Sequence, residues 1–499
     1  MLVVRKIYFM KFTYLLVLVG CFNFTACQAQ KVFPDGKEIP SWFDNKDKLD
    51  IDNLGKRYNI LEYGCSNDSN IVQTQAIQKV IDTASLNGGG VIVIPKGTFL
   101  SGSLFFKQGT HLHIESGGQL KGSDRIWDFK VLDTRIEGQS IKYFAALVNA
   151  DKVDGFTISG GGVINGNGWA YWKEFWIRRQ YNPDCTNLEA MRPRLVFVSN
   201  SKNVTIQDIC LSNSPFWTSH IYKCEKVRFL DCTFFAPSKG VFEQEPQRGA
   251  PSTDGIDIDV CHDILISGCN FNVNDDAIAL KGGKGAYADE DENNGSNSEI
   301  IVENCSFSHA LSCLTIGSES VYDKNVILRD SKCDGTTRVL RLKFRPDTPQ
   351  HFEFVNVGNI SGNVDRFLSI RPWTQFAEDL GRKDMPLSRA NNFFFEGIDV
   401  TCNSFFDVEE PDQYYIKDFT FSNSVITDYS NNFDSNSLEW INLDNFNYNG
   451  QCLGCTQSGI KHPNYRNKSL SDDYDLRGIK ESGNIKGIRI TKGTKCIVK

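Results

Sequence analysis

Three aspartates occupy related positions in two strand-like segments of the sequence. Asp254 lies two residues before Ile256, and Asp276 lies two residues before Ile278, so that the two aspartates are 22 residues apart. If these segments are neighbouring parallel strands in register, the aspartates come to adjacent positions with backbones ~4.8 Å apart. Asp275 adjoins Asp276. We therefore expect three carboxyl groups in one patch.

Positively charged residues follow the same register. Counting from the first apolar residue of each such segment, Arg341 stands one step on, and Lys281, Lys343 and Arg371 stand three steps on. The formal net charge of the chain is −7, so these cations do not reflect a basic composition, and a nucleic-acid partner has no support. Lysine and arginine pair with carboxylates. The row favours a groove that holds an anionic polymer.

Crowded carboxyl groups beside cations are suited to cleaving a glycosidic bond. One carboxylic acid must stay protonated to donate to the leaving oxygen, while another must be ionised to activate water or attack the sugar. Repulsion between like charges separates the pKa values and makes both forms available. Two alternatives stay open at this point: the carboxylates could bind a calcium ion, or they could be ordinary loop residues.

A histidine follows the aspartates in the next segment of the series. His309 lies five residues before Leu314. It could donate a hydrogen bond to an aspartate and help to set its protonation state, or it could be an ordinary packing residue.

An irregular repeat supplies the elements that would position these residues. Short runs alternate apolar and polar residues, and each is followed by Asp, Asn or Gly, with intervals of 23, 37, 36 and 26 residues between the first five. The first series of runs starts at Val204, Val227, Ile264, Ile300 and Val326, with similar runs at Leu112, Phe156, Phe352, Phe393 and Phe419. A second series starts at Ile256, Ile278, Leu314, Leu340 and Leu368. Period-two alternation indicates strands, and stacked coils with variable loops give such intervals.

The repeat predicts an all-β solenoid with at least two parallel sheets and about ten coils between residues 90 and 430. A short helix over 74–85 would cap the open end of the stack. Cys232, Cys269 and Cys305 share one offset in the repeat and are expected to form an inward stack of small side chains, although the coil spacing also allows bridging. Cys452 and Cys455 could form a bridge or half a metal site, but without a second pair a zinc site is not expected.

The N-terminus has the pattern of a targeting segment. Arg5, Lys6 and Lys11 precede an apolar run over 14–22 that is too short to span a bilayer as a helix. We expect residues 1–27 to be a signal peptide, with either a lipid attached to Cys27 or an ordinary cleavage after Ala29. Either outcome places the protein outside the cytoplasm: periplasmic or anchored to the outer membrane in a bacterium, otherwise secreted. Residues 28–56 are expected to be a linker, and a single solenoid is expected to be a monomer.

Four motifs together resemble glycoside hydrolase family 28, the polygalacturonase family. They are Ser-Thr-Asp254-Gly-Ile-Asp, Val-Asn-Asp275-Asp276-Ala-Ile-Ala-Leu-Lys, Ser-His309-Ala and Arg341-Leu-Lys343. The resemblance covers about 57–430, leaving 431–499 as a C-terminal tail packed on the helix. It implies a right-handed parallel β-helix, no cofactor, no metal and an inverting mechanism. Asp275 would be the general acid, Asp254 and Asp276 would hold and deprotonate water, His309 would assist, and Arg341 and Lys343 would bind the galacturonate carboxylate.

The sequence departs from the family pattern at two places. Ser252 stands where the family has Asn, and Ser-His309-Ala replaces Gly-His-Gly. Other segments resemble a bacterial, exo-acting branch, and insertions over 175–193 and 236–251 could close one end of the groove. We therefore predict an exo-polygalacturonase acting on pectic polysaccharide or oligogalacturonides. The alternatives are a rhamnogalacturonan hydrolase of the same family, a non-catalytic sugar-binding β-helix, and a calcium-dependent pectate lyase.

Overall fold

The computed structural model describes residues 32–241, 248–378 and 382–455, and three short strands near the C-terminus, β32 (Tyr474–Asp475), β33 (Gly487–Thr491) and β34 (Thr494–Val498). The predicted signal peptide, with Cys27, lies outside the described residues, and its lipidation stays a prediction. In the described part, no helix has the length and apolar character needed to cross a membrane.

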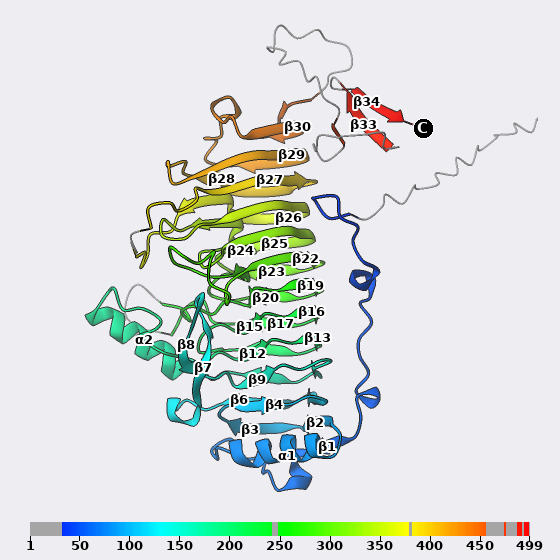
Figure 1. Ribbon diagram of the computed structural model, residues 1–499, viewed down its shortest axis with the longest axis vertical. Helices are drawn as coiled ribbons and strands as arrows, with labels where there is room; N and C mark the ends of the chain where they lie inside the picture. Colours follow the sequence, from blue (N-terminus) through cyan, green and yellow to red (C-terminus); the bar gives the residue numbers. More distant parts are fainter. Residues whose placement is uncertain are drawn as a thin grey trace, which may run out of the picture.

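The described chain forms a right-handed parallel β-helix (Figure 1). Strands of successive coils pair in parallel and build three columns. The first column contains β1 (Arg57–Asn59), β2 (Gly90–Ile94), β5 (Thr110–Ile114), β10 (Thr157–Ser159), β13 (Lys202–Gln207), β16 (Glu225–Leu230), β19 (His262–Ser267), β22 (Ser296–Glu303), β27 (Ser388–Glu396) and parts of the long strands β25 (Tyr322–Phe344), β26 (His351–Pro372) and β29 (Tyr414–Asp428).

The second column carries the predicted site. It contains β4 (Leu104–Phe106), β9 (Val148–Asp151), β12 (Val196–Ser199), β15 (Ser219–Tyr222), β18 (Ile256–Asp259), β21 (Ile278–Lys281), β24 (Leu314–Ile316), parts of β25 and β26, and β28 (Asp399–Val408). These are ten successive strands, in agreement with the ten coils expected. The third column contains β3 (Gly97–Ser101), β6 (Gly118–Gly122), β11 (Val163–Asn165), β14 (Cys210–Ser212), β17 (Thr233–Phe235), β20 (Asn270–Asn272) and β23 (Ser306–His309), continued by the long strands.

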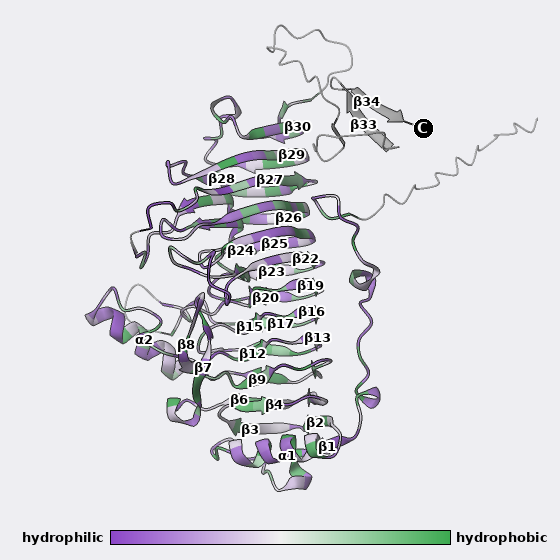
Figure 2. Ribbon diagram, viewed as in Figure 1, coloured by the Kyte–Doolittle hydropathy of each residue, from purple (hydrophilic) through white to green (hydrophobic). Residues whose placement is uncertain are grey.

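The register of the second column confirms the series predicted from the sequence. Ile256 pairs with Ile278, Ile278 with Leu314, Leu314 with Leu340, and Leu340 with Leu368. In the first column the series from Val204 to Val326 is confirmed in the same way. Hydrophilic and hydrophobic residues alternate along these strands, as Figure 2 shows for β26 and β27, because successive side chains of a strand point to opposite faces.

Two of the similar runs have starts that were predicted wrongly. Leu112 pairs with Ile158, two residues beyond the predicted start at Phe156. Val326 pairs with Val355, whereas Phe352 pairs with Asp323 three residues earlier. At Phe352 the reason is that Phe354, with φ 56°, takes the left-handed position that Asn325 and Asn392 take before the neighbouring runs. Phenylalanine rarely adopts this conformation, so the alternating Phe-Glu-Phe of the sequence indicates a strand that begins at Phe352.

Asp, Asn and Gly after each first-column run serve as corner residues. Asp208, Asp231, Gly268, Asn304 and Asp330 all have φ between 52° and 70°. Glycine adopts this left-handed region freely, and Asn and Asp tolerate it better than other residues. Each corner ends a first-column strand and lets the chain turn towards the third column.

Small and aromatic side chains stack inside the solenoid. Cys232, Cys269 and Cys305 are buried and unbridged, which confirms the predicted inward stack. Phe271 lies between Phe234 and Phe307, with ring centroids 4.8 and 5.1 Å apart. Near the C-terminal end, Cys452 and Cys455 are joined by a disulfide, which decides between the bridge and the metal half-site considered above.

Both ends of the stack are covered. Helix α1 (Thr74–Leu86) buries Ile77, Val80 and Ile81 against the first coil, as predicted for 74–85. At the other end β30 (Ile441–Tyr448) pairs in parallel with β29 and in an antiparallel manner with β31 (Gln451–Leu453). Parallel pairing therefore continues beyond residue 430, where the solenoid was expected to end.

Residues 32–56, expected to be a linker, run along the outside of the first column (Figure 1). We call this segment the strap. It contains two 3₁₀ turns, Ser41–Asp44 and Ile51–Asn53. Phe33 and Phe43 are buried in a small cluster with outward side chains of the first column, Leu230, Leu265, Ile301 and Ile327. The strap thus covers apolar groups that the coils direct away from the core.

Candidate active site

The second column brings the three predicted aspartates together. Asp254 and Asp276 precede paired strands at the same offset, and the N–H of Gly255, beside Asp254, donates to the carbonyl of Asp276 over 3.0 Å. One carboxylate oxygen from each of Asp254, Asp275 and Asp276 lies within 4.8 Å of the others. Asp254 and Asp276 are buried, whereas Asp275 is partly exposed and accepts a hydrogen bond from the backbone of Asp276.

Two cations of β25, two coils further on, lie against Asp276. The Nζ of Lys343 lies 2.6 Å from one Asp276 oxygen, and a guanidinium nitrogen of Arg341 lies 4.0 Å from the other. The hydroxyl of Ser312 donates to Asp276 over 2.6 Å. Arg341 and Lys343 also lie 5.1 and 4.9 Å from the ring centre of Trp373.

The surroundings shift the pKa values of the three carboxyl groups in different directions. Burial opposes the charge on Asp276, but Lys343 and Arg341 outweigh this effect and lower its pKa below the ordinary value. Burial, and then the charge of Asp276, raises the pKa of Asp275. Burial, followed by Asp275 and Asp257, raises the pKa of Asp254 well above the ordinary value. The surroundings therefore favour the ionised form of Asp276 and the protonated forms of Asp254 and Asp275, and acid–base catalysis needs pKa values that differ in this way.

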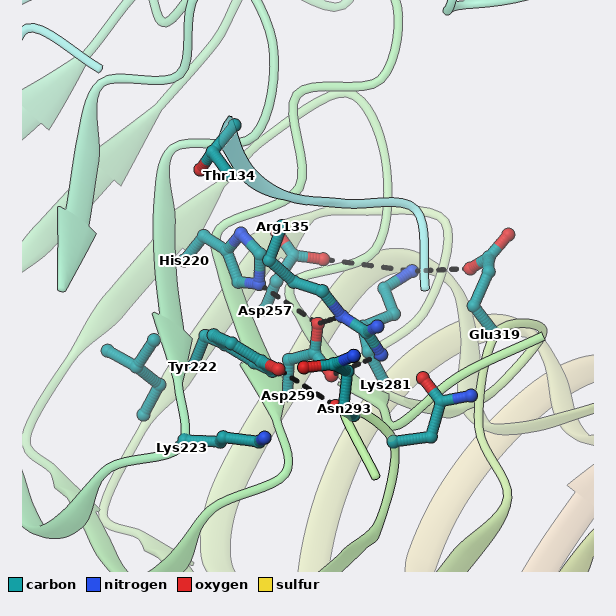
Figure 3. A network of polar contacts seen from close by, with 12 residues as sticks. Thr134, Arg135, His220, Tyr222, Lys223, Asp257, Asp259, Lys281, Asn293 and Glu319 are labelled. Atoms are coloured by element: carbon teal, nitrogen blue, oxygen red, sulfur yellow. Dashed lines mark hydrogen bonds and ion pairs between the residues drawn. The ribbon is translucent and has the colours of Figure 1, made fainter. Parts of the chain in front are cut away.

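Lys281 lies beside this cluster within a buried network (Figure 3). Its Nζ is 3.2 Å from Glu319 and 3.7 Å from Asp257. Next to it, Arg135 donates to Asp259 over 2.9 Å and His220 lies 3.3 Å from Asp259. Lys281, predicted as a substrate ligand, thus already has two carboxylates, and the sequence pattern did not indicate Glu319.

A cavity of about 690 Å³ covers the site. The coils contribute Asp254, Asp275, Lys281, Arg341 and Lys343 to its lining. Further walls come from segments inserted between strands: the hairpin β7 (Val131–Ile136) and β8 (Gln139–Phe144), helix α2 (Trp169–Tyr181) with the loop after it, and the loop before Asp254. These supply Glu137, Gln139, Phe175, Trp176, Arg179, Asn187 and Arg248. The segments that follow β21, β24, β25 and β26 also line the cavity, with Lys284, Glu319, Arg345 and Trp373 among their residues. The two predicted insertions therefore do border the site.

Comparison with known proteins adds to this geometry. The family model described as glycosyl hydrolases family 28 matches residues 89–361, more than half of the chain. The chain belongs to glycosyl hydrolase family 28. It is therefore a glycoside hydrolase, and the predicted family is confirmed.

Curated relatives of this family 28 chain carry both exo and endo names. An exopolygalacturonase of Platanus acerifolia is 25% identical over 308 residues, 60% of this chain and 70% of the relative. An endo-polygalacturonase of Pectobacterium parmentieri is 28% identical over 278 residues, 54% of this chain and 64% of the relative. Across the curated relatives compared, the matched part spans between 45% and 70% of their length.

Solved structures of the family share the fold. An exopolygalacturonase from Thermotoga maritima has a TM-score of 0.63 at 21% identity, covering 83% of this chain and 96% of that one. A family 28 exopolygalacturonase from Yersinia enterocolitica has a TM-score of 0.61 at 17% identity, covering 79% of this chain and 78% of that one. At this level of identity the likeness supports the β-helix architecture alone.

Two predicted site residues make no ion pair or side-chain hydrogen bond with the three aspartates in the described part of this family 28 structure. His309 ends β23 opposite Asn272, with the pairing irregular at that point, and in the described part of the chain no hydrogen bond or ion pair joins it to an aspartate. Burial lowers the pKa of His309. Arg371 lies one coil beyond Lys343 and pairs with Asp407 and Glu409, outside the cavity lining.

Proposed function

We propose that this family 28 hydrolase is an exo-acting polygalacturonase that releases α-linked galacturonic acid from a chain end with inversion. The observation that carries the proposal is the arrangement of Asp254, Asp275 and Asp276 within 4.8 Å of one another. Asp254 and Asp275 line a cavity together with Arg341, Lys343 and inserted segments, and Asp276 is buried behind them. Cleavage of the sugar is thereby combined with recognition of its carboxylate.

The three aspartates would divide the work by protonation state. Asp275, whose pKa is raised, would donate a proton to the glycosidic oxygen as the bond to the anomeric carbon breaks. Asp276, whose pKa is lowered, would take the proton of the attacking water. Asp254 would hold that water by hydrogen bonding, because its raised pKa favours, in the resting site, the protonated form, which cannot take up a second proton.

Arg341 and Lys343 would bind the carboxylate of the sugar beside the scissile bond. Two cations face one ionised aspartate in this part of the cavity, so one positive charge is left for an anionic ligand. The face of Trp373 lies next to both and offers a surface for a sugar ring.

Exo action is supported by the walls of the cavity. The hairpin β7–β8, helix α2 and the loop before Asp254 all contribute lining residues from segments that precede Asp254 in the chain, and such walls would limit the number of sugar units that fit there. The inverting course rests on the family resemblance. It predicts that the first product of the α-linked substrate is the β-anomer.

Product analysis tests this function. Purified enzyme is offered polygalacturonate, oligogalacturonides and rhamnogalacturonan in parallel, with and without a chelator. We expect monogalacturonate from the first two, no unsaturated sugar and no effect of the chelator. Unsaturated products would indicate a lyase, products from rhamnogalacturonan alone would indicate the alternative hydrolase, and a mixture of long oligomers at early times would contradict exo action.

The substrate class also bears on where the enzyme works. Pectic polymers do not enter the cytoplasm intact, so we propose that the enzyme is exported through the signal predicted over 1–27. Radiolabelled fatty acid in the wild-type protein, absent from the Cys27→Ala variant, would support the lipid anchor, and an unlabelled wild-type protein would favour simple secretion.

A further inference from the structure

Three arginines gather around one aromatic pair at the wall of the cavity formed by α2. The guanidinium of Arg179 lies 4.7 Å from the ring centre of Phe175, and that of Arg192 lies 4.3 Å from the same ring. Arg248 lies 4.9 Å from the ring of Trp176. Arg179 and Arg248 line the cavity together with both aromatic rings, and all of these residues belong to the inserted segments.

None of the three arginines is paired with a carboxylate among the residues that the structure describes. Arg179 donates only to the carbonyl of Cys185. Arg192 is buried and donates to the amide of Asn187, while its Nε and one terminal nitrogen have no hydrogen-bond partner. In contrast, every other cation of the cavity lies within 4.0 Å of a carboxylate: Lys281, Lys284, Arg341, Lys343 and Arg345.

Positive charge at this wall therefore has no carboxylate within ion-pair distance among the described residues, and the more distant charge of Glu137 acts favourably on both Arg179 and Arg192. Burial lowers the pKa of Arg192 to about 10. Burial also lowers the pKa of Arg179, and the positive charge of Arg248 lowers it further. Cations in proteins are normally paired when they are taken from water. An anion bound in the cavity would remove the repulsion between Arg179 and Arg248, and guanidinium groups match the two oxygens of a carboxylate.

We propose that Arg179 and Arg248, backed by Arg192, form a second carboxylate-binding subsite for a galacturonate ring other than the one held by Arg341 and Lys343. This inference rests on the proposed function and specifies it. The two subsites lie on different parts of the fold, α2 with its neighbouring loop and the C-terminal coils of the second column (Figure 1). They would select a substrate in which two rings carry free carboxylates.

Binding measurements on an inactive enzyme test the subsite. The full-length Asp275→Asn variant is titrated calorimetrically with trigalacturonate and with its fully methyl-esterified form, alone and combined with Arg179→Met, Arg179→Lys or Arg248→Met. We expect either methionine to weaken trigalacturonate binding about tenfold, the scale of one charge-assisted hydrogen bond. Binding of the ester should be unchanged, and Arg179→Lys should restore part of the loss.

Arg178 provides a matched control on the same helix. It pairs with Glu174 and does not line the cavity, so Arg178→Met should bind both ligands like the parent. Arg248 is exposed and makes no hydrogen bond in the described chain, so its variant is expected to fold even if Arg179→Met does not.

The outcomes separate this inference from the proposed function. Equal affinity of parent and variants for trigalacturonate, or an equal loss for the acid and the ester, would overturn the subsite while leaving the function in place. Failure of the active enzyme to cleave any galacturonide would instead contradict the proposed function itself.

Discussion

Asp276 is ionised although it is fully buried, and its neighbours explain why. Burial alone would favour the neutral acid. Lys343 at 2.6 Å, Arg341 at 4.0 Å and the hydroxyl of Ser312 reverse this preference. The resulting negative charge in turn raises the pKa of Asp275. The acid and the base of the proposed mechanism therefore depend on each other and on the same two cations.

Removing Lys343 should change the pH dependence of catalysis. The base works when it is ionised, so activity falls as the pH drops through the pKa of Asp276, and it falls at high pH as Asp275 loses its proton. In Lys343→Met the pKa of Asp276 should rise, which moves the acidic limb of the kcat profile to higher pH. An acidic limb at the wild-type position would show that Lys343 does not control this carboxylate. Lys284→Met, which removes a cation that lines the same cavity and pairs with Glu137, is the control.

The sequence predicted the charged residues of the site better than their partners. Asp254 and Asp276 could be placed side by side because one uninterrupted coil separates them, and Asp275 adjoins Asp276. Parallel pairing in register then brings residues at the same offset together. The positions of Lys281 and Arg371 followed from the same register, but their carboxylates, Glu319 and Asp407, lie on neighbouring coils whose loops have irregular lengths. Such side-chain pairing depends on the conformation of the loops, which the alternation of apolar and polar residues does not predict.

At the scale of elements, the hairpin β7–β8 is held to the second column by buried charge. Arg135 of β7 forms an ion pair with Asp259 of β18 at 2.9 Å, with both side chains almost fully buried. Arg194 donates to the carbonyl of Arg135 and to Thr134. Because the turn of this hairpin brings Glu137 and Gln139 to the cavity, the ion pair positions one wall of the site (Figure 3).

Breaking this ion pair should be costly. Arg135→Met leaves the buried charge of Asp259 without its arginine, and such changes cost about 3–5 kcal/mol of folding free energy. Chemical denaturation of the variant measures the loss. Lys142→Met on the same hairpin removes an exposed pair with Asp133 and should change stability little. Equal stability of the two variants would show that the hairpin is anchored by other contacts.

Regular elements were predicted more readily than inserted ones. The columns and α1 follow from apolar periodicity, which selects a buried face in each strand or helix. Helix α2 was treated only as part of an insertion, because its aromatic residues Trp172, Phe175 and Trp176 lie on a flank of the solenoid and pack in small separate clusters. Arg179, the arginine of α2 that lines the cavity, therefore had no signal in the sequence.

At the scale of the whole molecule, the strap ties distant coils together. Besides Phe33 and Phe43, which cover outward apolar residues of the first column, Lys46 pairs with Glu303 and Lys48 with Asp208 and Asp231. A solenoid gains stability from contacts between neighbouring coils. The strap adds contacts that connect coils separated by more than one step.

Loss of one strap aromatic should weaken the entire stack. Phe43→Ala removes a buried side chain from a small cluster, and substitutions of this kind cost about 3–5 kcal/mol. The measurement is denaturant unfolding followed by both fluorescence and circular dichroism. Lys48→Ala, which removes only exposed ion pairs, is expected to have little effect. A stable Phe43→Ala protein would mean that the strap is a passive covering.

The mechanism is tested most directly by asking whether Asp275 supplies the proton to the leaving group. The rate of the Asp275→Asn variant is compared with that of the wild type on trigalacturonate and on α-galacturonosyl fluoride, whose leaving group needs no protonation. We predict a loss of several orders of magnitude on trigalacturonate, with much of the activity on the fluoride retained. Wild-type activity of the variant on trigalacturonate, or an equal loss on both substrates, would contradict the assignment of Asp275 as the general acid.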